Sequence, residues 1–341
     1  MYNINDITVI MPVYNEEKHI KKALECIINQ TWQGYIELII VDNESTDRTL
    51  LFIDEIKGNL PKNRSIKVLT NNIKSIPKSL NIACNAATCD IIIRIDRHTY
   101  APLNYVEECI DSLQKVEFKG VVGGRCIIQP NSDNTLAKAI AIGVTNKVGI
   151  GNAAYRNPNI DHELLLDVDT VPFGSYTKEL WGELGGYDEN LPFDEDYDFN
   201  FRAIEKGYKV VLNPKILLNY YSRENLKQLW DQYFKYGFWA NKFCIKHKTI
   251  PSIRRFIPLT FIVSLILTPI INMLLFKFII LLYLLVISIT ALYEGLIKRR
   301  SVLLTINLLS VFITLHFSYG IGSLASFFDE LRDRLIKKND K

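Results

Sequence analysis

Cysteine is scarce in this sequence and shows no metal-binding or disulfide-forming pattern. The 341 residues include 6 cysteines, and none of them lies in a Cys-x-x-Cys spacing. Zinc ribbons depend on such spacings, and disulfide-linked scaffolds are short, secreted, cysteine-rich chains. The pattern therefore points away from both classes and predicts reduced, mostly buried thiols in a cytosolic compartment.

The net charge is small, and the first residues do not have the pattern of a signal peptide. The formal net charge is +3, which is too small to indicate a nucleic-acid partner. Residues 1–6 are polar and lead directly into an apolar run, so no secretory signal peptide is predicted. No internal repeat is present, which excludes a repeat architecture.

The chain has instead three long uncharged stretches after residue 256. They comprise residues 256–276, 278–293 and 302–328. Each is close to the roughly 20 apolar residues that cross the core of a bilayer. The sequence therefore predicts a membrane region at 256–328, with two or three helices, followed by a charged tail at 329–341.

Basic residues flank these stretches and predict their orientation. Arg254 and Arg255 precede the first stretch, and residues 298–300 follow the second. The positive-inside rule places both flanks in the cytoplasm, with an outer turn at Lys277. A third full span would put the basic tail outside, so it stays open whether 302–328 spans, re-enters or lies at the interface. We expect a multi-pass protein of the cell (inner) membrane with a cytoplasmic catalytic domain.

The N-terminal two thirds alternate between strand and helix patterns. Apolar runs at residues 7–11, 38–41, 66–69 and 90–95 are separated by segments with helical periodicity. This alternation is typical of βαβ units and a mostly parallel sheet flanked by helices, a Rossmann-like α/β domain. We place this domain at residues 1–222.

The second predicted strand ends abruptly in polar residues. Its apolar run stops at Asp42, and Ser45 or Thr46 is predicted to cap the next helix, with Asp47 in its first turn. Ligands of open α/β sheets bind at the carboxyl ends of strands, so Asp42 is a candidate ligand contact. A capping cluster without any ligand is the alternative.

The fourth predicted strand ends in a possible metal motif. Asp96 and His98 are two residues apart. A carboxylate with an imidazole suits Mn²⁺, whereas Mg²⁺ prefers oxygen ligands and keeps waters and substrate phosphates. Such an ion would neutralise a diphosphate leaving group. An ordinary surface loop is the alternative.

Four acids lie within five positions, at Asp194, Glu195, Asp196 and Asp198. Crowded carboxylates repel one another, so one of them can have a raised pKa and act as a general base. Phe199 and Phe201 predict that this segment opens a helix. A solvated acidic loop is the alternative.

Two further segments are candidates for the acceptor side. Residues 171–176 are apolar and glycine-bearing, which fits either an acceptor pocket or a bent core strand. Residues 225–246 read as an aromatic, lysine-bearing helix, within a predicted amphipathic helix and basic linker at 223–255. Such a helix lies well at a membrane interface or packs on the sheet.

Taken together, these motifs resemble the inverting GT-A glycosyltransferases of family two, over roughly residues 5–245. A closer likeness is to succinoglycan-type exopolysaccharide glucosyltransferases with C-terminal membrane spans. The matching motifs are Met11-Pro12-Val13-Tyr14-Asn15-Glu16, Val41-Asp42-Asn43-Glu44-Ser45-Thr46-Asp47, Arg94-Ile95-Asp96-Arg97-His98, Val171-Pro172-Phe173-Gly174, Gly185-Gly186-Tyr187-Asp188, Asp194-Glu195-Asp196 and Gln232-Tyr233-Phe234-Lys235-Tyr236-Gly237.

The resemblance implies a GT-A fold, a nucleotide-sugar donor and metal-dependent transfer with inversion. It implies that Asp42 reads the nucleobase, usually uracil. It also implies that Asp196 deprotonates the acceptor hydroxyl, with Glu195 beside it. The other implied donor-side contacts are Pro12, Tyr14, Glu16, Asn81, Arg94 and Asp96, the implied metal ligands are Asp96 and His98, and the acceptor-side residues are Phe173, Gly174, Gln232 and Lys235.

The sequence also departs from the family in two places. Arg94 and His98 stand where the commoner Asp-x-Asp pattern has acids, so Arg94 is predicted to contact phosphate directly. The segment from Gln232 lacks the Gln-x-x-Arg-Trp of processive synthases, which favours addition of one sugar. We expect Mg²⁺ or Mn²⁺, a UDP-sugar, a polyprenyl-diphosphate-linked saccharide acceptor, membrane lipid and other polysaccharide-assembly enzymes as partners. A processive synthase and a non-catalytic nucleotide-sugar-binding membrane protein are the alternatives.

Overall fold

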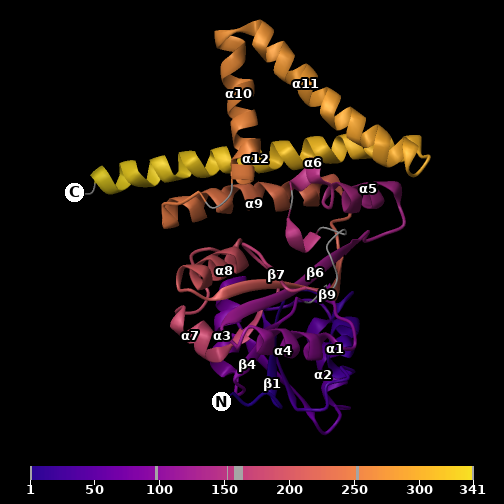
Figure 1. Cartoon of the computed structure of the whole chain (residues 1–341), viewed down its shortest axis with the longest axis vertical. Coiled ribbons are helices and arrows are strands. Elements are labelled where there is room, and N and C mark those ends of the chain that lie inside the picture. Colours follow the sequence, from indigo (N-terminus) through magenta and orange to yellow (C-terminus); the bar gives the residue numbers. More distant parts are fainter. Residues whose placement is uncertain (1, 97–98, 152, 157–163, 251–252, 340–341) are drawn as a thin grey trace. The chain divides into compact units, whose positions relative to one another are not determined.

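The computed structural model describes residues 2–96, 99–151, 153–156, 164–250 and 253–339 (Figure 1). The chain forms two compact units, which are described separately. The first comprises Met1–Ile127 and Ala154–Tyr220, and the second comprises Ile128–Ala153 and Tyr221–Lys341. The second unit thus includes a segment from within the predicted catalytic domain. The domain boundaries drawn from the sequence stay predictions.

The described residues of the first unit form one sheet of 9 strands, in the order β3-β2-β1-β4-β8-β6-β9-β5, with β7 paired to β9. β1 to β4 are parallel where they pair with one another, and β8 is antiparallel to both β4 and β6. The α/β class predicted from the sequence is confirmed, with an antiparallel second half. The strands are β1 (Ile7–Val13), β2 (Ile36–Asp42), β3 (Arg64–Thr70), β4 (Ile91–Arg94), β5 (Thr99–Tyr100), β6 (Gly120–Gln129), β7 (Leu166–Asp167), β8 (Ser175–Thr177) and β9 (Lys209–Tyr221).

Helices pack on this sheet through periodic apolar faces. In α1, four residues at helical spacing are buried, namely Ile20, Ala23, Leu24 and Ile27. Burying each larger aliphatic side chain contributes about 1.5–3 kcal/mol to folding. The helices of this unit are α1 (Ile20–Ile28), α2 (Thr49–Lys57), α3 (Ile76–Ala86), α4 (Tyr105–Lys115), α7 (Lys178–Glu183) and α8 (Glu195–Glu205), with a 3-10 turn at Ala154–Arg156.

The predicted cap of the second helix is wrong. α2 begins at Thr49, and the carboxylate of Asp47 accepts the Thr49 backbone N–H at 3.0 Å. Ser45 and Thr46 are engaged instead with Asn15 in the loop after β1: the Ser45 hydroxyl accepts the Asn15 N–H, and the Thr46 N–H donates to the Asn15 side chain. These residues therefore tie two strand ends together rather than starting a helix.

The second unit is helical. Among its described residues, three helices are long and apolar enough to cross a membrane, over Ile253–Ile271, Met273–Ile297 and Val302–Ile336. The elements are α5 (Thr135–Gly143), α6 (Lys147–Ile150), α9 (Leu226–His247), a 3-10 turn (Ile253–Phe256), α10 (Ile257–Ile271), α11 (Met273–Ala291), a π-helical turn (Leu292–Ile297) and α12 (Val302–Asn339).

The turn between the first two apolar helices lies at Asn272, so its predicted position at Lys277 is wrong. The Asn272 side chain accepts the backbone N–H groups of Leu274 and Leu275 and caps α11. A capping asparagine stops and restarts the helix, whereas a single lysine inside an apolar run does not. Lys277 lies within α11.

α12 packs along α9, as Figure 1 shows within the second unit. The two helices approach closely at Gly237 and Gly322, where an added Cβ would collide with the backbone of Tyr319 and Phe234 respectively. Small residues at such crossings let helix backbones meet. In addition, the Ser323 hydroxyl donates to the carbonyl of Gly237 at 3.1 Å.

Candidate active site

Three strand ends meet at one edge of the sheet in the first unit. β1 lies between β2 and β4, with Val13 paired to Asp42 and Ile10 paired to Arg94. Because these strands are parallel, Asp42, Asp96 and the residues that follow β1 lie at their shared carboxyl edge. This is the position at which open α/β sheets bind ligands.

Asp42 presents a buried carboxylate oxygen without a partner. The residue is 2% exposed. Its Oδ2 accepts the Ser45 backbone N–H at 3.1 Å, while Oδ1 has no hydrogen-bond partner among the described residues. An unsatisfied buried acceptor costs about 1–3 kcal/mol, so this oxygen is suited to an incoming N–H donor.

A buried amide network supports this strand end, and the sequence reading missed it. The Asn71 side chain donates to Asn43 Oδ1 at 3.0 Å and to the Ser79 hydroxyl at 3.0 Å, and Ser79 donates to the same Asn43 oxygen at 2.9 Å. Asn43 in turn donates to the carbonyl of Val13. The network links the ends of β1, β2 and β3 to α3. Asn43 and Asn71 follow neighbouring strands but are far apart in the sequence, so no local pattern revealed the network.

The residues after β1 form the wall next to Asp42. Pro12 is buried within β1, while Tyr14 and Glu16 are half-buried in the loop that follows. The Glu16 backbone N–H donates to Thr49 Oγ1 at 2.7 Å. The Lys74 ammonium lies 4.7 Å from the Tyr14 ring centroid and 3.3 Å from its hydroxyl. An aromatic ring and a cation therefore lie on the same wall, and Lys74 was not identified from the sequence.

Arg94 gathers the acids on the other side of the edge. Its guanidinium contacts Asp196 Oδ1 at 2.5 Å and Glu195 Oε1 at 2.8 Å, and it contacts Asp96 Oδ1 at 3.3 Å. The Arg94 side chain is 2% exposed, whereas Asp96 and Asp196 keep 16% and 23% of their side chains exposed. The two carboxylates can therefore meet a ligand that the arginine cannot.

The base candidate Asp196 is held at the start of α8. Glu195 and Asp196 are the first two residues of that helix, after Asp194 in a left-handed backbone conformation with φ of 64°. The second oxygen of Asp196, Oδ2, accepts the Phe173 N–H at 3.4 Å. The sequence predicted that this segment opens a helix, and the structure confirms it.

Burial raises the pKa of Asp196 to about 7; the charge of Arg94 lowers it, while Glu195 and Asp96 raise it. Burial also raises the pKa of Glu195, against the lowering effect of Arg94. A carboxyl that titrates near neutral pH is well matched to general-base catalysis. This part of the site can therefore take a proton from a hydroxyl group.

The sequence of this chain matches two family models and a known protein. Residues 8–168 match the family described as glycosyl transferase family 2, and residues 164–291 match glycosyl transferase family group 2. A dolichyl N-acetyl-alpha-D-glucosaminyl phosphate 3-beta-D-2,3-diacetamido-2,3-dideoxy-beta-D-glucuronosyltransferase from Methanococcus voltae is 30% identical over 69% of this chain and 72% of that protein. The chain belongs to glycosyltransferase family 2.

One further relative supports this assignment, and one solved structure supports the fold. The succinoglycan biosynthesis protein ExoA from Rhizobium meliloti is 27% identical over 74% of both chains. A solved mannosyltransferase from Pyrobaculum calidifontis, in complex with GDP-Man and Mn²⁺, has a TM-score of 0.58 at 16% identity, over 92% of this chain and 86% of that one. The predicted GT-A fold and the resemblance to succinoglycan-type transferases are confirmed.

The donor set of the glycosyltransferase fits a divalent ion that is held largely by its substrate. No group of three or more His, Cys, Asp or Glu side chains suited to a metal occurs within the part of the chain that the structure describes. Asp96 offers one partly exposed carboxylate. Mg²⁺ and Mn²⁺ bind nucleotides with one or two carboxylates, completing their shell with phosphates and water. His98, the second predicted ligand, lies outside the described residues.

Asn81 holds a turn of the protein in this structure. Its side-chain amide donates to the Tyr187 carbonyl at 2.8 Å and accepts the Tyr187 N–H at 2.8 Å. Asp198 is fully buried and pairs with Arg202 at 2.7 Å. Arg202 also donates to the carbonyl of Gly186. Both ends of the Asn81 amide are therefore engaged within the protein. A contact between Asn81 and the nucleotide-sugar donor stays a prediction.

The predicted acceptor residues fall into two groups. Phe173 lies beside the acids, with its ring centroid 5.7 Å from the Arg94 guanidinium carbon, and the Gly174 carbonyl accepts the Arg94 N–H. Gln232 and Lys235 lie on α9 in the second unit, where the Gln232 amide donates to the Tyr236 hydroxyl at 2.9 Å. An acceptor role for all four stays a prediction.

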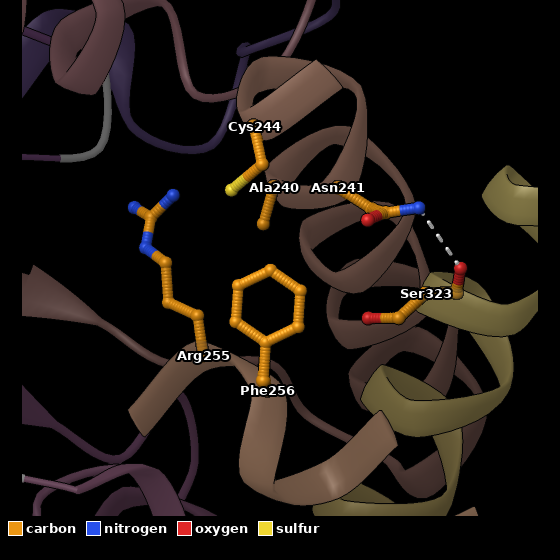
Figure 2. Close-up of a pocket in the computed structure, with 6 residues that line it drawn as sticks. All are labelled: Ala240, Asn241, Cys244, Arg255, Phe256 and Ser323. Carbon is orange, nitrogen blue, oxygen red and sulfur yellow. Dashed lines mark hydrogen bonds between the residues drawn. The ribbon is translucent and has the colours of Figure 1, made fainter. Parts of the chain in front are cut away.

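The second unit has a small pocket of its own, shown in Figure 2. It is lined from α9, the turn before α10, and α12 by Ala240, Asn241, Cys244, Arg255, Phe256 and Ser323. Two of these residues are hydrogen-bonded to each other: the Asn241 amide donates to the Ser323 carbonyl at 3.4 Å. The lining contains no carboxylate, so none of the acids predicted from the sequence lies there.

Replacing Asp42 with alanine is expected to weaken UDP binding by about 10- to 100-fold, with a much smaller change in kcat. A hydrogen bond to a charged group contributes about 1.5–3 kcal/mol, and each 1.4 kcal/mol is tenfold in affinity. Titration calorimetry with UDP measures it. The matched control is Asp54→Ala, at an exposed acid on α2. Equal UDP affinity in the Asp42 variant and the native protein would show that Asp42 does not contact the nucleobase.

Proposed function

We propose that this glycosyltransferase moves one sugar from a UDP-hexose to a polyprenyl-diphosphate-linked saccharide at the cytoplasmic face of the membrane. The observation that carries the proposal is the pairing of two centres at one sheet edge. Asp42 offers a buried acceptor to a nucleobase, and Asp196 offers a carboxylate whose pKa is about 7. The relatives named above act in lipid-linked saccharide and succinoglycan synthesis, which supports the acceptor class.

The proposed reaction is a direct displacement with inversion at the sugar anomeric carbon. The acceptor hydroxyl gives its proton to Asp196 while its oxygen bonds to the anomeric carbon. The bond from that carbon to the diphosphate oxygen breaks, and the nucleoside diphosphate leaves with the electron pair. Asp96 would hold Mg²⁺ or Mn²⁺, which when bound stabilises negative charge on the diphosphate. Asp42 and Tyr14 keep the nucleoside in place during the displacement.

We further propose that only α10 and α11 cross the membrane and that α12 lies at the cytoplasmic interface. Lys242 of α9 precedes the first span, and it pairs with Asp329 of α12 at 2.8 Å. That pair supports a position of the C-terminal part of α12 on the side where the first span begins. Two spans return the chain to the side from which it started, so the start of α12, which follows the second span, is on that side as well. Burial supports this arrangement: 44% of the most apolar window of α12 is buried, against 11% and 6% for the other two candidate spans.

This topology predicts the behaviour of reporter fusions. Green fluorescent protein fused after Lys341 is expected to fluoresce, and alkaline phosphatase at the same place to be inactive, because both report a cytoplasmic end. Alkaline phosphatase inserted at Asn272 is expected to be active and serves as the matched control. An active phosphatase at the C-terminus would show that α12 crosses the membrane.

The transfer reaction itself is tested with full-length protein in lipid nanodiscs and a defined polyprenyl-diphosphate saccharide. Radiolabelled UDP- and GDP-sugars are supplied with Mn²⁺, and the lipid product is separated by length. The proposal predicts one labelled sugar per lipid. Long products would indicate a processive synthase, and binding of donor with no label in lipid or in free sugar would indicate a binding protein.

A further inference from the structure

Arg94 stands where the commoner family pattern has an acid, and its backbone is fixed at both ends. It is the last residue of β4. Its N–H donates to the Gly174 carbonyl at 3.2 Å, and its carbonyl accepts the hydroxyl of the buried Tyr105 at 3.1 Å. The guanidinium therefore extends from a rigid strand end rather than from a mobile loop.

The guanidinium has little capacity left for a ligand. Nη1 donates to Asp196, and Nη2 donates to Asp96 and Glu195. Nε is buried without a hydrogen-bond partner among the described residues. An arginine has five N–H donors, and phosphate recognition uses them in an accessible fork. At 2% exposure, this fork faces protein carboxylates, which argues against direct contact with the donor phosphates.

The three acids come from two separate parts of the chain, and Arg94 pairs with all of them. Asp96 follows β4, while Glu195 and Asp196 begin α8, about one hundred residues later. Carboxylates gathered in a partly buried site repel one another unless a cation compensates them. The rings of Phe173 and Tyr187 lie 5.7 and 6.0 Å from the guanidinium carbon, and the Arg94 side chain is 2% exposed.

We propose that Arg94 is a positioning residue that locks the base Asp196 and the donor-side Asp96 into one constellation. This inference rests on the proposed function, because it gives Asp196 the role of base. Arg94 occupies Asp196 Oδ1, so Oδ2, with its longer 3.4 Å contact from the Phe173 N–H, is the oxygen that takes the acceptor proton. Arg94 thereby aligns the proton acceptor with the leaving diphosphate without touching either substrate.

Lysine at this position keeps one positive charge but lacks the planar fork that spans three carboxylates. Misplacing a catalytic group by about 1 Å costs roughly 10²-fold in rate. Arg94→Lys is therefore expected to lower kcat by about 10²-fold, while the Kd for UDP stays within about threefold. The matched control is Arg202→Lys. Arg202 pairs with Asp198 within α8, and it has no contact with Asp196 among the described residues.

A double-mutant cycle separates positioning from general structural support. In an Asp196→Asn background the base is absent, so Arg94→Lys is expected to lower the single-turnover rate by less than about threefold more. Full additivity of the two losses would overturn the positioning role. A loss of UDP affinity equal to the loss of rate would instead make Arg94 a phosphate ligand, and would also overturn it.

Two measurements keep the proposal falsifiable if Arg94→Lys folds poorly, as judged by circular dichroism. Glu195→Gln leaves the arginine in place and frees more of its charge for Asp196, so the acid limb of the kcat profile should move to lower pH. An acid limb at the same pH as in the native protein would contradict the sharing of the Arg94 charge between Glu195 and Asp196.

The native protein is assayed first. No transfer would refute the proposed function together with this inference, whereas normal transfer with an additive double-mutant cycle would refute only the role of Arg94.

Discussion

Asp196→Asn is expected to lower the rate of sugar transfer by about 10²- to 10⁴-fold while leaving UDP affinity nearly unchanged, since this range is what general-base assistance contributes. Asparagine keeps the shape of the side chain and can still accept the Arg94 hydrogen bond through its carbonyl oxygen. It cannot take a proton from the acceptor hydroxyl. Steady-state kinetics with saturating lipid acceptor, together with calorimetric titration of UDP, measure the two quantities.

The control for this substitution is Asp194→Asn, two residues earlier in the chain. Asp194 has a left-handed backbone conformation that asparagine adopts readily, so the variant should preserve the local fold. We expect its kcat to stay within a few-fold of the native value. If Asp196→Asn also turned over at a near-native rate, the base would have to be another group.

The pH dependence of kcat is expected to show an acid limb near pH 7, with the rate falling about tenfold for each pH unit below it. Burial raises the pKa of Asp196 to about 7, and a base works only in its deprotonated form. Activity is therefore lost as pH falls through 7. At pH 5 the expected rate is about 10²-fold below the plateau, which makes this one of the largest predicted effects.

The same carboxyl should affect stability in the opposite direction. Its folded pKa is raised above the ordinary value of 3.8, so the folded state binds this proton more tightly than the unfolded chain. The resulting stabilisation is fully present below pH 3.8 and is lost as pH rises through about 7. In the Asp196→Asn variant, both the acid limb of the kcat profile and this contribution to stability should be absent.

A kcat profile of the native protein that is flat between pH 5 and 8 would contradict a base with this pKa.

The fold and the position of the site could be predicted because they depend on local patterns. Apolar runs that alternate with helical periodicity specify a parallel sheet, and the carboxyl edge of such a sheet is where ligands bind. Asp42 and Asp96 were placed at this edge for that reason. The cluster around Asp196 was placed on a helix start because Phe199 and Phe201 follow it at helical spacing.

The partners of these residues could not be predicted, because they depend on contacts between distant parts of the chain. Arg94 looked like a phosphate ligand in a strand-end motif, yet its guanidinium faces acids about one hundred residues away. Nothing local distinguished Asp196, which faces the site, from Asp198, which pairs with Arg202 in the interior. Asn81 likewise resembled a ligand contact, while the turn at Tyr187 occupies its amide.

In the apolar C-terminal region, hydropathy located the helices but not their ends or packing. The uncharged stretches gave three long helices, since length and composition are sufficient for that. The turn at Asn272 depended on one capping side chain. The pairing of α12 with α9 depended on glycines far apart in sequence, at Gly237 and Gly322.

A structure of the full-length protein with UDP and Mn²⁺ tests the account most directly. It should show uracil donating an N–H to Asp42 Oδ1 and the diphosphate beside Asp96, on the same edge of the sheet as the exposed face of Asp196. The Arg94 guanidinium should remain on its three carboxylates. A nucleotide bound away from Asp42, or a diphosphate held by Arg94 in place of those acids, would contradict the account.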